Sequence, residues 1–305
     1  MNGYEGILPI WKPAGFTSHD VVAKCRGILK MKRIGHTGTL DPAVTGVLPL
    51  CLGRATRMVE YLQELPKEYE ATLVLGLATD TEDMTGTVVE RSDGVQVTEA
   101  QILTVFERFV GQISQIPPMY SALKQDGKRL YELAREGKVV ERQPRQVTIH
   151  ELELLRFEAD PAHPRISFRT LCSKGTYIRT LCVDIGRALG VPAVMGELKR
   201  TMSAGIREDR CLTLEQLADR VREGELQSRL IAVDEAVSHL PASTVAEEKV
   251  KAALQGQRLS RAVVQPTAEP GEIIRLYSPE RKFLGIYRSE EETGAIAPVK
   301  VFPPE

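Results

Sequence analysis

The order of helical and strand-like segments is the feature that most constrains the fold of this chain. Amphipathic helices are predicted at 18–29, 99–110, 178–189 and 214–221, three of them starting after a threonine that can cap the helix. Strand-like stretches lie between them, at 69–75, 87–90, 146–157 and 165–171. The two kinds of element do not alternate as in a parallel βαβ sheet. We therefore predict an α+β fold with a mixed, largely antiparallel sheet.

One segment is predicted to leave this core. Residues 117–146 open with Pro117-Pro118 and are rich in Lys, Arg, Gln and Gly, with one weak helical pattern around 130–134. A long polar stretch of this kind is typical of an excursion from a compact domain. We predict a larger domain over residues 1–240 that contains this insertion.

The pattern changes beyond residue 240. A short helix is predicted at about 245–255, followed by strands at 273–277, 283–288 and 297–302 that are separated by turn residues. We predict a small closed β-domain over residues 245–305.

Apolar segments and cysteines limit where such a chain can work. The longest nearly apolar stretch, residues 43–52, is much shorter than the ~20 residues of a membrane helix, and the N-terminus lacks a signal-peptide pattern. We expect a cytoplasmic protein with no membrane partner. The five cysteines include no C-x-x-C pair, which predicts reduced core thiols rather than disulfides or a zinc site.

Charge is balanced in total and segregated along the chain. The chain has 40 Lys and Arg against 41 Asp and Glu, but residues 24–57, 124–145 and 174–207 carry net charges of +6, +3 and +4. If these segments meet on one face, they form a surface for a polyanion such as RNA. The alternative is a set of solvated helix faces that never converge. We predict that the three segments border one cleft.

The densest polar pattern is the segment RIGHTGTLDPAVTGVLPLCLG at 33–53. Its four glycines and short polar side chains allow close backbone approach to a phosphate or a sugar. It has neither the P-loop pattern nor the dinucleotide fingerprint, so we predict no nucleotide cofactor. Asp41-Pro42 alone is typical of a turn.

This segment resembles the active-site motif of the TruB family of tRNA pseudouridine synthases, in which a GHTGTLDP-type sequence carries the catalytic aspartate. Four further segments are similar to motifs of the same family in the same order: KPAG at 12–15, KEYEATLVLGLATDTEDMTG at 67–86, PPMYSALKQDGK at 117–128 and CSKGTYIRTL at 172–181. The resemblance spans most of the first 240 residues. It implies the pseudouridine synthase fold, with an RNA-gripping insertion at about 117–146 and a C-terminal PUA-like β-barrel that binds RNA.

The resemblance also implies three catalytic residues, Asp41, Tyr69 and Arg179. Asp41 acts either as a nucleophile or as the base that deprotonates the ribose, and the residues do not decide between these roles. Arg179 pairs with Asp41 and keeps it ionised. Tyr69 lies against the uracil and assists loss of the C5 proton.

Substrate-binding residues are implied by the same resemblance. His36 occupies the space that a flipped nucleotide leaves, Tyr177 and Leu198 complete the base pocket, and Lys12 supports the active-site loop. Gly38 and Thr39 belong to that loop and are counted with these residues.

The implied function is the isomerisation of uridine to pseudouridine at position 55, in the TΨC loop of tRNA, through base flipping. The reaction requires no metal, redox partner or nucleotide, and we expect a monomer with the tRNA stem-loop as its partner. Two alternatives stay open. A non-catalytic RNA chaperone would use only the basic segments, and a nucleosidase would need a second carboxylate near Asp41, for which Asp80, Glu82 and Asp83 are the candidates.

Overall fold

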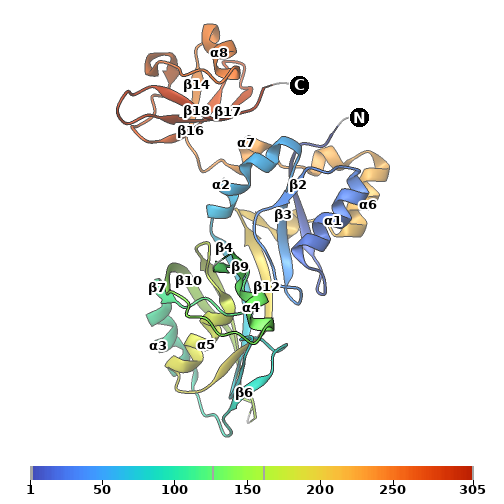
Figure 1. Cartoon of the computed structure of the whole chain (residues 1–305), viewed down its shortest axis with the longest axis vertical. Coiled ribbons are helices and arrows are strands. Elements are labelled where there is room, and N and C mark those ends of the chain that lie inside the picture. The colour runs from blue at the N-terminus through green and yellow to red at the C-terminus, as the bar shows by residue number, and fades with distance from the viewer. Residues whose placement is uncertain (1–2, 126, 161, 304–305) are drawn as a thin grey trace.

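A large sheet runs through the main part of the molecule (Figure 1). The computed structural model describes residues 3–125, 127–160 and 162–303. Within these residues the strands of the large sheet are β1 (Gly6–Lys12), β2 (Ile34–His36), β3 (Thr45–Leu52), β4 (Lys67–Leu75), β7 (Gly111–Gln115), β10 (Arg145–Glu158), β11 (Arg165–Cys172), β12 (Ala193–Ser203) and β13 (Ile206–Arg207).

The strand order confirms the predicted class. Nine strands pair in the order β1-β3-β12-β4-β11-β10-β7, with β2 joined to β3 and β13 to β12. β12 and β3 pair in parallel, and the other neighbours pair antiparallel. The sheet is therefore mixed and largely antiparallel, as expected of an α+β fold.

Helix starts follow the capping residues in the sequence. Thr17, Thr98 and Thr213 each accept a hydrogen bond from the backbone N–H three residues on and form a capping box. The α-helices of the described residues are α1 (Ser18–Leu29), α2 (Val59–Glu64), α3 (Glu99–Phe109), α4 (Leu130–Arg135), α5 (Ile178–Ala188), α6 (Leu214–Glu223), α7 (Val233–Ala236) and α8 (Val250–Leu254). In the described ranges, no helix has the length and apolar character needed to cross a bilayer.

Two apolar cores lie against the two halves of the large sheet. Ile102 and Phe106 of α3 pack with Ile185 of α5 against Phe168 of β11. Residues of α1 and α6 pack against β1 and β3 in a separate cluster around Leu50. The two cores hold β4 and β12 in the middle of the sheet, where both strands are available to line a site.

The chain between β7 and β10 leaves the sheet and returns to it. Arg145 at the start of β10 is paired with Gln115 at the end of β7. Between them lie the short strands β8 (Lys124–Gln125) and β9 (Lys128–Arg129), followed by α4. A second small hairpin, β5 (Leu77–Thr79) with β6 (Val88–Arg91), follows β4.

A separate five-stranded sheet forms the C-terminal part. Its strands are β14 (Ala242–Val245), β15 (Val264–Gln265), β16 (Ile273–Tyr277), β17 (Phe283–Ser289) and β18 (Ile296–Val301), in the order β15-β14-β16-β17-β18. Among the described residues no strand ladder joins β15 to β18, so closure into a PUA-like barrel stays a prediction.

The helix expected at about 245–255 is wrong at its start. Val245 ends β14, whose pairing with β15 and β16 satisfies its backbone, and the α-helix covers only Val250–Leu254. Ser243 and Val245 are buried, whereas Ala242 and Thr244 before and between them are only partly buried. This alternation is typical of a strand, and the helix prediction did not take it into account.

The C-terminal sheet packs on the main domain through an apolar contact. Ile286 and Phe302 are buried in one cluster with Met58 and Val237. The Arg57 guanidinium lies over the Phe302 ring, 5.4 Å from its centroid. Figure 1 shows this sheet at one end of the molecule, beside α7.

Four of the five cysteines are buried in the core, and Cys211 is partly buried. All five are free, and burial raises the pKa of the Cys25 thiol from 9.0 to about 12. The folded state therefore keeps a proton that the unfolded state releases, and this contribution to stability is lost as pH rises from about 9 towards 12. Urea unfolding at several pH values should show that Cys25→Ala loses less stability per pH unit than wild type, by up to about 1.4 kcal/mol. Equal slopes would contradict the protonated buried thiol.

Candidate active site

One cavity gathers most of the residues that the sequence singled out. It has a volume of about 460 Å³ and is lined by the loop after β2, by β4, by the start of the insertion, by the β11–α5 turn with the first turn of α5, and by β12. Seven of the predicted site residues line it: Gly38, Thr39, Asp41, Tyr69, Tyr177, Arg179 and Leu198. His36 and Lys12 are not among its lining residues.

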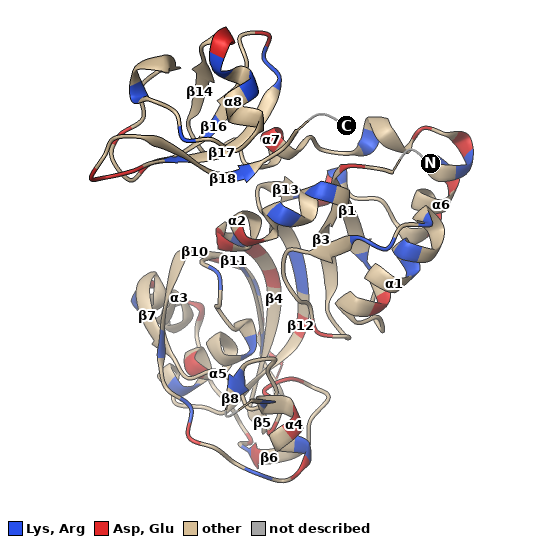
Figure 2. Cartoon of the chain, turned by 45° about the horizontal axis from the view of Figure 1, so that its top comes forward, with Lys and Arg blue, Asp and Glu red and all other residues tan. Residues whose placement is uncertain are grey.

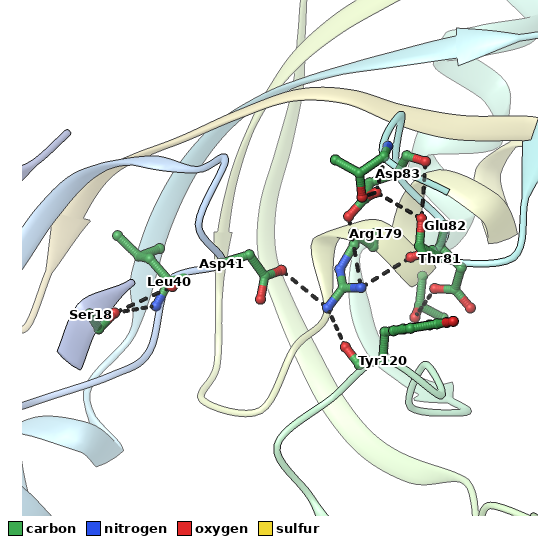
Figure 3. A network of polar contacts seen from close by, with 10 residues as sticks. Ser18, Leu40, Asp41, Thr81, Glu82, Asp83, Tyr120 and Arg179 are labelled. Carbon is green, nitrogen blue, oxygen red and sulfur yellow. Dashed lines mark hydrogen bonds and ion pairs between the residues drawn. The ribbon is translucent and has the colours of Figure 1, made fainter. Parts of the chain in front are cut away.

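The central contact is the ion pair of Asp41 with Arg179 (Figure 3). Nη2 of Arg179 lies 3.1 Å from Oδ2 of Asp41. The arginine side chain is only 6% exposed, whereas the Asp41 side chain is 42% exposed and borders the open cavity. A charge-assisted bond of this kind fixes the direction of the carboxylate.

Backbone carbonyls hold Arg179 in place from two other segments. Nη1 donates to the carbonyl of Thr81 at 3.0 Å, and Nη2 donates to the carbonyl of Tyr120 at 2.8 Å. Tyr120 lies at the start of the insertion. Arg179 therefore links the Asp41 loop, the turn after β5 and the insertion in one network (Figure 3).

Asp83 is a second carboxylate beside this arginine. Its Oδ2 lies 4.0 Å from Nη1 of Arg179, and its Oδ1 accepts hydrogen bonds from the Thr81 hydroxyl and the Thr85 amide. Asp83 was considered only as the acid of a nucleosidase, and its role as a partner of Arg179 was missed. Its place in the same segment as Tyr69 was the only signal available.

A nucleosidase would need a second carboxylate beside Asp41. Each of the three candidates, Asp80, Glu82 and Asp83, is held by other partners. Figure 3 shows the Arg179 guanidinium between Asp41 and Asp83. Asp80 accepts from the Thr87 amide, and Glu82 accepts from the Thr180 hydroxyl, with burial raising the pKa of the Glu82 carboxyl. Among the described residues, no three His, Cys, Asp or Glu side chains gather as metal ligands would.

Lys12 holds the loop that carries Asp41 through hydrogen bonds to backbone carbonyls. Its Nζ donates to the carbonyls of Pro13, Pro42 and Val44 at 3.0, 3.1 and 2.6 Å. Burial lowers the pKa of Lys12 to about 8, an effect that the Asp41 charge opposes. Lys12 thus contacts the loop just after Asp41, at Pro42 and Val44, and is not among the residues that line the cavity.

One wall of the cavity is formed by residues of β4 and β12. Tyr69 is paired with Arg200, and Ala71 with Leu198, across the antiparallel ladder. Burial raises the pKa of the Tyr69 hydroxyl, while the Arg200 charge and a hydrogen bond with Arg200 oppose the shift. Arg200 is a cavity residue that the sequence did not single out.

Tyr177 closes the cavity on the α5 side. It is the N-cap residue of α5, and its backbone N–H and C=O are bonded by the side-chain amide of Gln115 at 3.0 and 3.2 Å. Burial raises the pKa of the Tyr177 hydroxyl.

His36 lies outside the lining of the cavity. It is in β2, paired with Leu50, and its ring meets the His19 ring edge-on at 5.7 Å. Burial, followed by the neighbouring charges of His19 and Arg200, lowers the pKa of His36. Its Nδ1 is buried without a hydrogen-bond partner among the described residues.

The three basic segments meet only in part. Residues of the first and third segments line the cavity, among them Thr39, Lys174 and Arg200, whereas the insertion contributes 121–123, just before the second segment begins. Figure 2 shows Lys and Arg on α1, on β12 and around β8 and α4. Segments 24–57 and 174–207 thus border one cavity, but the lysines and arginines that line it within them are Lys174, Arg179 and Arg200 of the second. The basic side chains of 24–57 and of the insertion are not among its lining residues.

Comparison with known families covers nearly the whole chain. Residues 26–178 match the TruB family pseudouridylate synthase (N terminal domain). Residues 179–238 match the tRNA pseudouridylate synthase B C-terminal domain, and residues 241–302 match Pseudouridine synthase II TruB, C-terminal.

Individual proteins agree with these matches. The chain is 44% identical over 301 residues to tRNA pseudouridine synthase B of Oceanobacillus iheyensis, which covers 98% of this chain and 97% of that protein. It is 43% identical over 303 residues to tRNA pseudouridine synthase B of Bacillus licheniformis, with coverage of 98% and 97%.

Solved structures show the same likeness. A chain in the crystal structure of a Cbf5-Nop10-Gar1 complex is 29% identical with a TM-score of 0.76, over 98% of this chain and 85% of that one. A chain of an H/ACA RNP bound to a substrate RNA containing 2′-deoxyuridine is 28% identical with a TM-score of 0.74, at the same coverage. With three consecutive family matches and relatives above 40% identity along its length, this chain belongs to the TruB family of pseudouridine synthases.

Proposed function

We propose that this protein isomerises uridine to pseudouridine at position 55, in the TΨC loop of tRNA. One observation carries the proposal: an exposed Asp41 carboxylate is paired with a buried arginine at the edge of a cavity of about 460 Å³. The relatives that are named tRNA pseudouridine synthase B cover almost the whole chain, which supports tRNA as the substrate.

The proposed chemistry starts at the glycosidic bond. The bond between N1 of uracil and C1′ breaks, and its electron pair stays on the base. Asp41 either bonds to C1′ or removes the C2′ proton, so that the electron deficiency at the ribose is satisfied in both routes. The base then turns and C5 bonds to C1′, while the Asp41–C1′ bond breaks in the first route or the abstracted proton returns to C2′ in the second. Loss of the C5 proton completes the isomerisation.

The remaining site residues are proposed to serve this chemistry in three ways. Arg179 fixes the direction of the Asp41 carboxylate, and Lys12 holds the loop through the carbonyls of Pro42 and Val44. Tyr69 and Leu198 provide the wall against which the uracil lies, since both line the cavity from adjacent strands.

Base flipping follows from the depth of the cavity. A base reaches these walls only after leaving its stack, and enzymes that act on a base extrude it in this way. Tyr177, Gly38 and Thr39 line the cavity and are proposed to contact the flipped nucleotide. His36 is proposed to contact the RNA at the position that this nucleotide leaves.

Release of tritium tests the proposed reaction. Unmodified tRNA labelled with tritium at uridine C5 should lose one label per tRNA when incubated with the protein, because the C5 proton leaves. Mass spectrometry of the RNA should show no change in mass beyond the isotope exchange, whereas a nucleosidase would remove a base. Absence of release would contradict the isomerase proposal and favour an RNA chaperone.

The insertion is expected to grip the RNA through its basic side chains. Lys124 and Arg129 are exposed, and Lys128 is half-exposed in a 3.0 Å ion pair with Glu136. Reversal of all three charges to Glu should weaken tRNA binding by about 10-fold or more and flatten the salt dependence, by about 0.7–0.9 in slope per lost phosphate contact. Filter binding over a series of salt concentrations measures both effects.

A control with the same change in net charge locates the effect. Arg220, Arg222 and Arg229 lie in or after α6, away from the cavity lining, and can be reversed together. This variant should bind with less than about a threefold loss, because charges beyond a Debye length are screened. Equal losses in the two variants would show that the insertion has no special place in binding.

A further inference from the structure

Two buried cations lie at the floor of the cavity without an acidic partner. Arg200 is completely buried and Lys67 is 8% exposed, and both line the cavity. Among the described residues neither forms an ion pair with a carboxylate. Buried charges in proteins are ordinarily paired, so these two cations point to a negative charge that arrives with the substrate or forms during the reaction.

Backbone oxygens hold both side chains in place. Nζ of Lys67 donates to the carbonyls of Gln63 and Leu65 at 2.9 and 3.0 Å, which leaves one of its three N–H groups without a protein acceptor. The Arg200 guanidinium donates to the carbonyls of Val47 and Gly38 at 2.8 and 3.1 Å. These bonds orient the cations but do not neutralise them.

The two cations face the same small region. Lys67 and Tyr69 are two residues apart on β4 and share one face of the sheet, and Arg200 lies opposite Tyr69 on β12. A Cβ placed on Gly38 would lie 3.4 Å from Cε of Lys67 and 3.5 Å from Nη1 of Arg200. A glycine without a side chain therefore leaves the space beside both cations open.

The residues proposed to contact the ribose and those proposed to contact the base lie at different depths in the cavity. Asp41, proposed to react with the ribose, is 42% exposed, whereas Tyr69, Lys67 and Arg200 are at most 8% exposed. Lys174, at 56% exposed, is a cation at the rim and forms an ion pair with Glu64. A backbone phosphate would therefore meet the rim, and the group that reaches the floor is the flipped base.

We propose that Lys67 and Arg200 stabilise the uracil anion that forms when the N1–C1′ bond breaks. This inference rests on the proposed function. The electron pair of the broken bond stays on the ring, where its charge is shared with O2 and O4, and the cations face that charge until C5 bonds to C1′ and the C5 proton leaves. Both residues then act as catalytic residues, as fixed donors do at an oxyanion.

The unusual acidity of Lys67 agrees with this role. Burial lowers its pKa from 10.5 to about 8, and the Arg200 charge acts in the same direction. An anion bound beside the ammonium would reverse both effects. The site is thus better suited to the anionic intermediate than to the neutral base, which is the condition for lowering the barrier.

The proposal is tested by comparing wild type and Lys67→Met on two substrates whose bases differ in how well they carry negative charge as leaving groups. Stem-loop RNAs with uridine or 5-fluorouridine at the target position are compared in single turnover, with loss of the parent nucleoside followed by chromatography. Lys67→Met should slow the uridine reaction by about 100-fold, with unchanged RNA affinity. Because fluorine itself stabilises the uracil anion, the loss should be at least about fivefold smaller with 5-fluorouridine.

Three further variants complete the test. Lys67→Arg keeps the charge and should recover most of the rate, while Lys67→Gln is the neutral alternative if the Met variant fails to fold by circular dichroism. Lys174→Met, which removes a rim charge, should slow both RNAs by the same factor. Equal losses for Lys67→Met on both RNAs, or weaker binding with a flatter salt dependence, would overturn the proposal, the latter by indicating a phosphate. Failure of wild type on uridine would instead contradict the proposed function.

Discussion

Asp41→Asn should reduce tritium release from tRNA by at least about 10⁴-fold, because an amide is neither a nucleophile nor a base. The substitution preserves the size of the side chain and the loop around it, which Lys12 and the Ser18–Leu40 contact hold independently. Affinity for tRNA should stay the same or increase, since a negative charge facing a polyanion is removed. Single-turnover release with enzyme in excess, together with filter binding, measures both quantities.

An exposed aspartate elsewhere supplies the control. Asp219 lies in α6 and forms a surface ion pair with Arg222, so Asp219→Asn should keep the wild-type rate. Full release by Asp41→Asn would contradict a catalytic role for Asp41. Retained RNA folding activity in a variant that releases no tritium would show that any chaperone function is separate from the cavity.

Local signals were enough to predict the four longest helices, α1, α3, α5 and α6. The capping box at Thr17 involves Asp20, and the one at Thr98 involves Gln101, so each helix start is determined within four residues. β11 alternates regularly in burial, and the strand patterns of β10 and β11 were visible in the sequence. These elements depend little on distant parts of the chain.

The adjacent strands β3 and β12 were missed because long-range contacts define them. β12 contains Arg200, whose burial depends on the carbonyls of Val47 and Gly38, more than 150 residues away. β3 contains Gly46 and Pro49, which locally argue against a strand. A Cβ on Gly46 would lie 2.3 Å from the carbonyl oxygen of Arg200, so this glycine permits the close approach of β3 and β12.

The candidate site divides in the same way. Asp41, Tyr69 and Arg179 were identified from motifs that resemble a known family, and all three line the cavity. Lys67 opens the motif that contains Tyr69 and Arg200 lies outside the motifs, but their charge without a carboxylate partner is visible only once the backbone oxygens around them are placed. Residue type and spacing do not reveal a buried cation without a carboxylate, since most lysines and arginines are exposed.

Arg179→Met should lower the isomerisation rate by about 10³-fold and also destabilise the fold. Methionine fills much of the same space but leaves the carbonyls of Thr81 and Tyr120 without their donor and Asp41 without its partner. Since unsatisfied buried carbonyls cost about 1–3 kcal/mol each and Asp41 can turn to solvent, a loss of about 2–4 kcal/mol in unfolding free energy is expected. Urea denaturation and single-turnover release measure the two effects on the same preparations.

A matched control on the same helix separates the effect on the orientation of Asp41 from the effect on the stability of the fold. Arg187 is exposed near the end of α5 and pairs with Asp184 across one turn, so Arg187→Met should change stability by less than about 1 kcal/mol and leave the rate unchanged. Arg179→Lys should restore more stability than activity, because one ammonium cannot reproduce the fork that meets Asp41, Thr81 and Tyr120 together. A lysine variant with wild-type rate would contradict this geometry, because it would show that positive charge alone, without the fixed direction of the guanidinium, is enough to prepare Asp41.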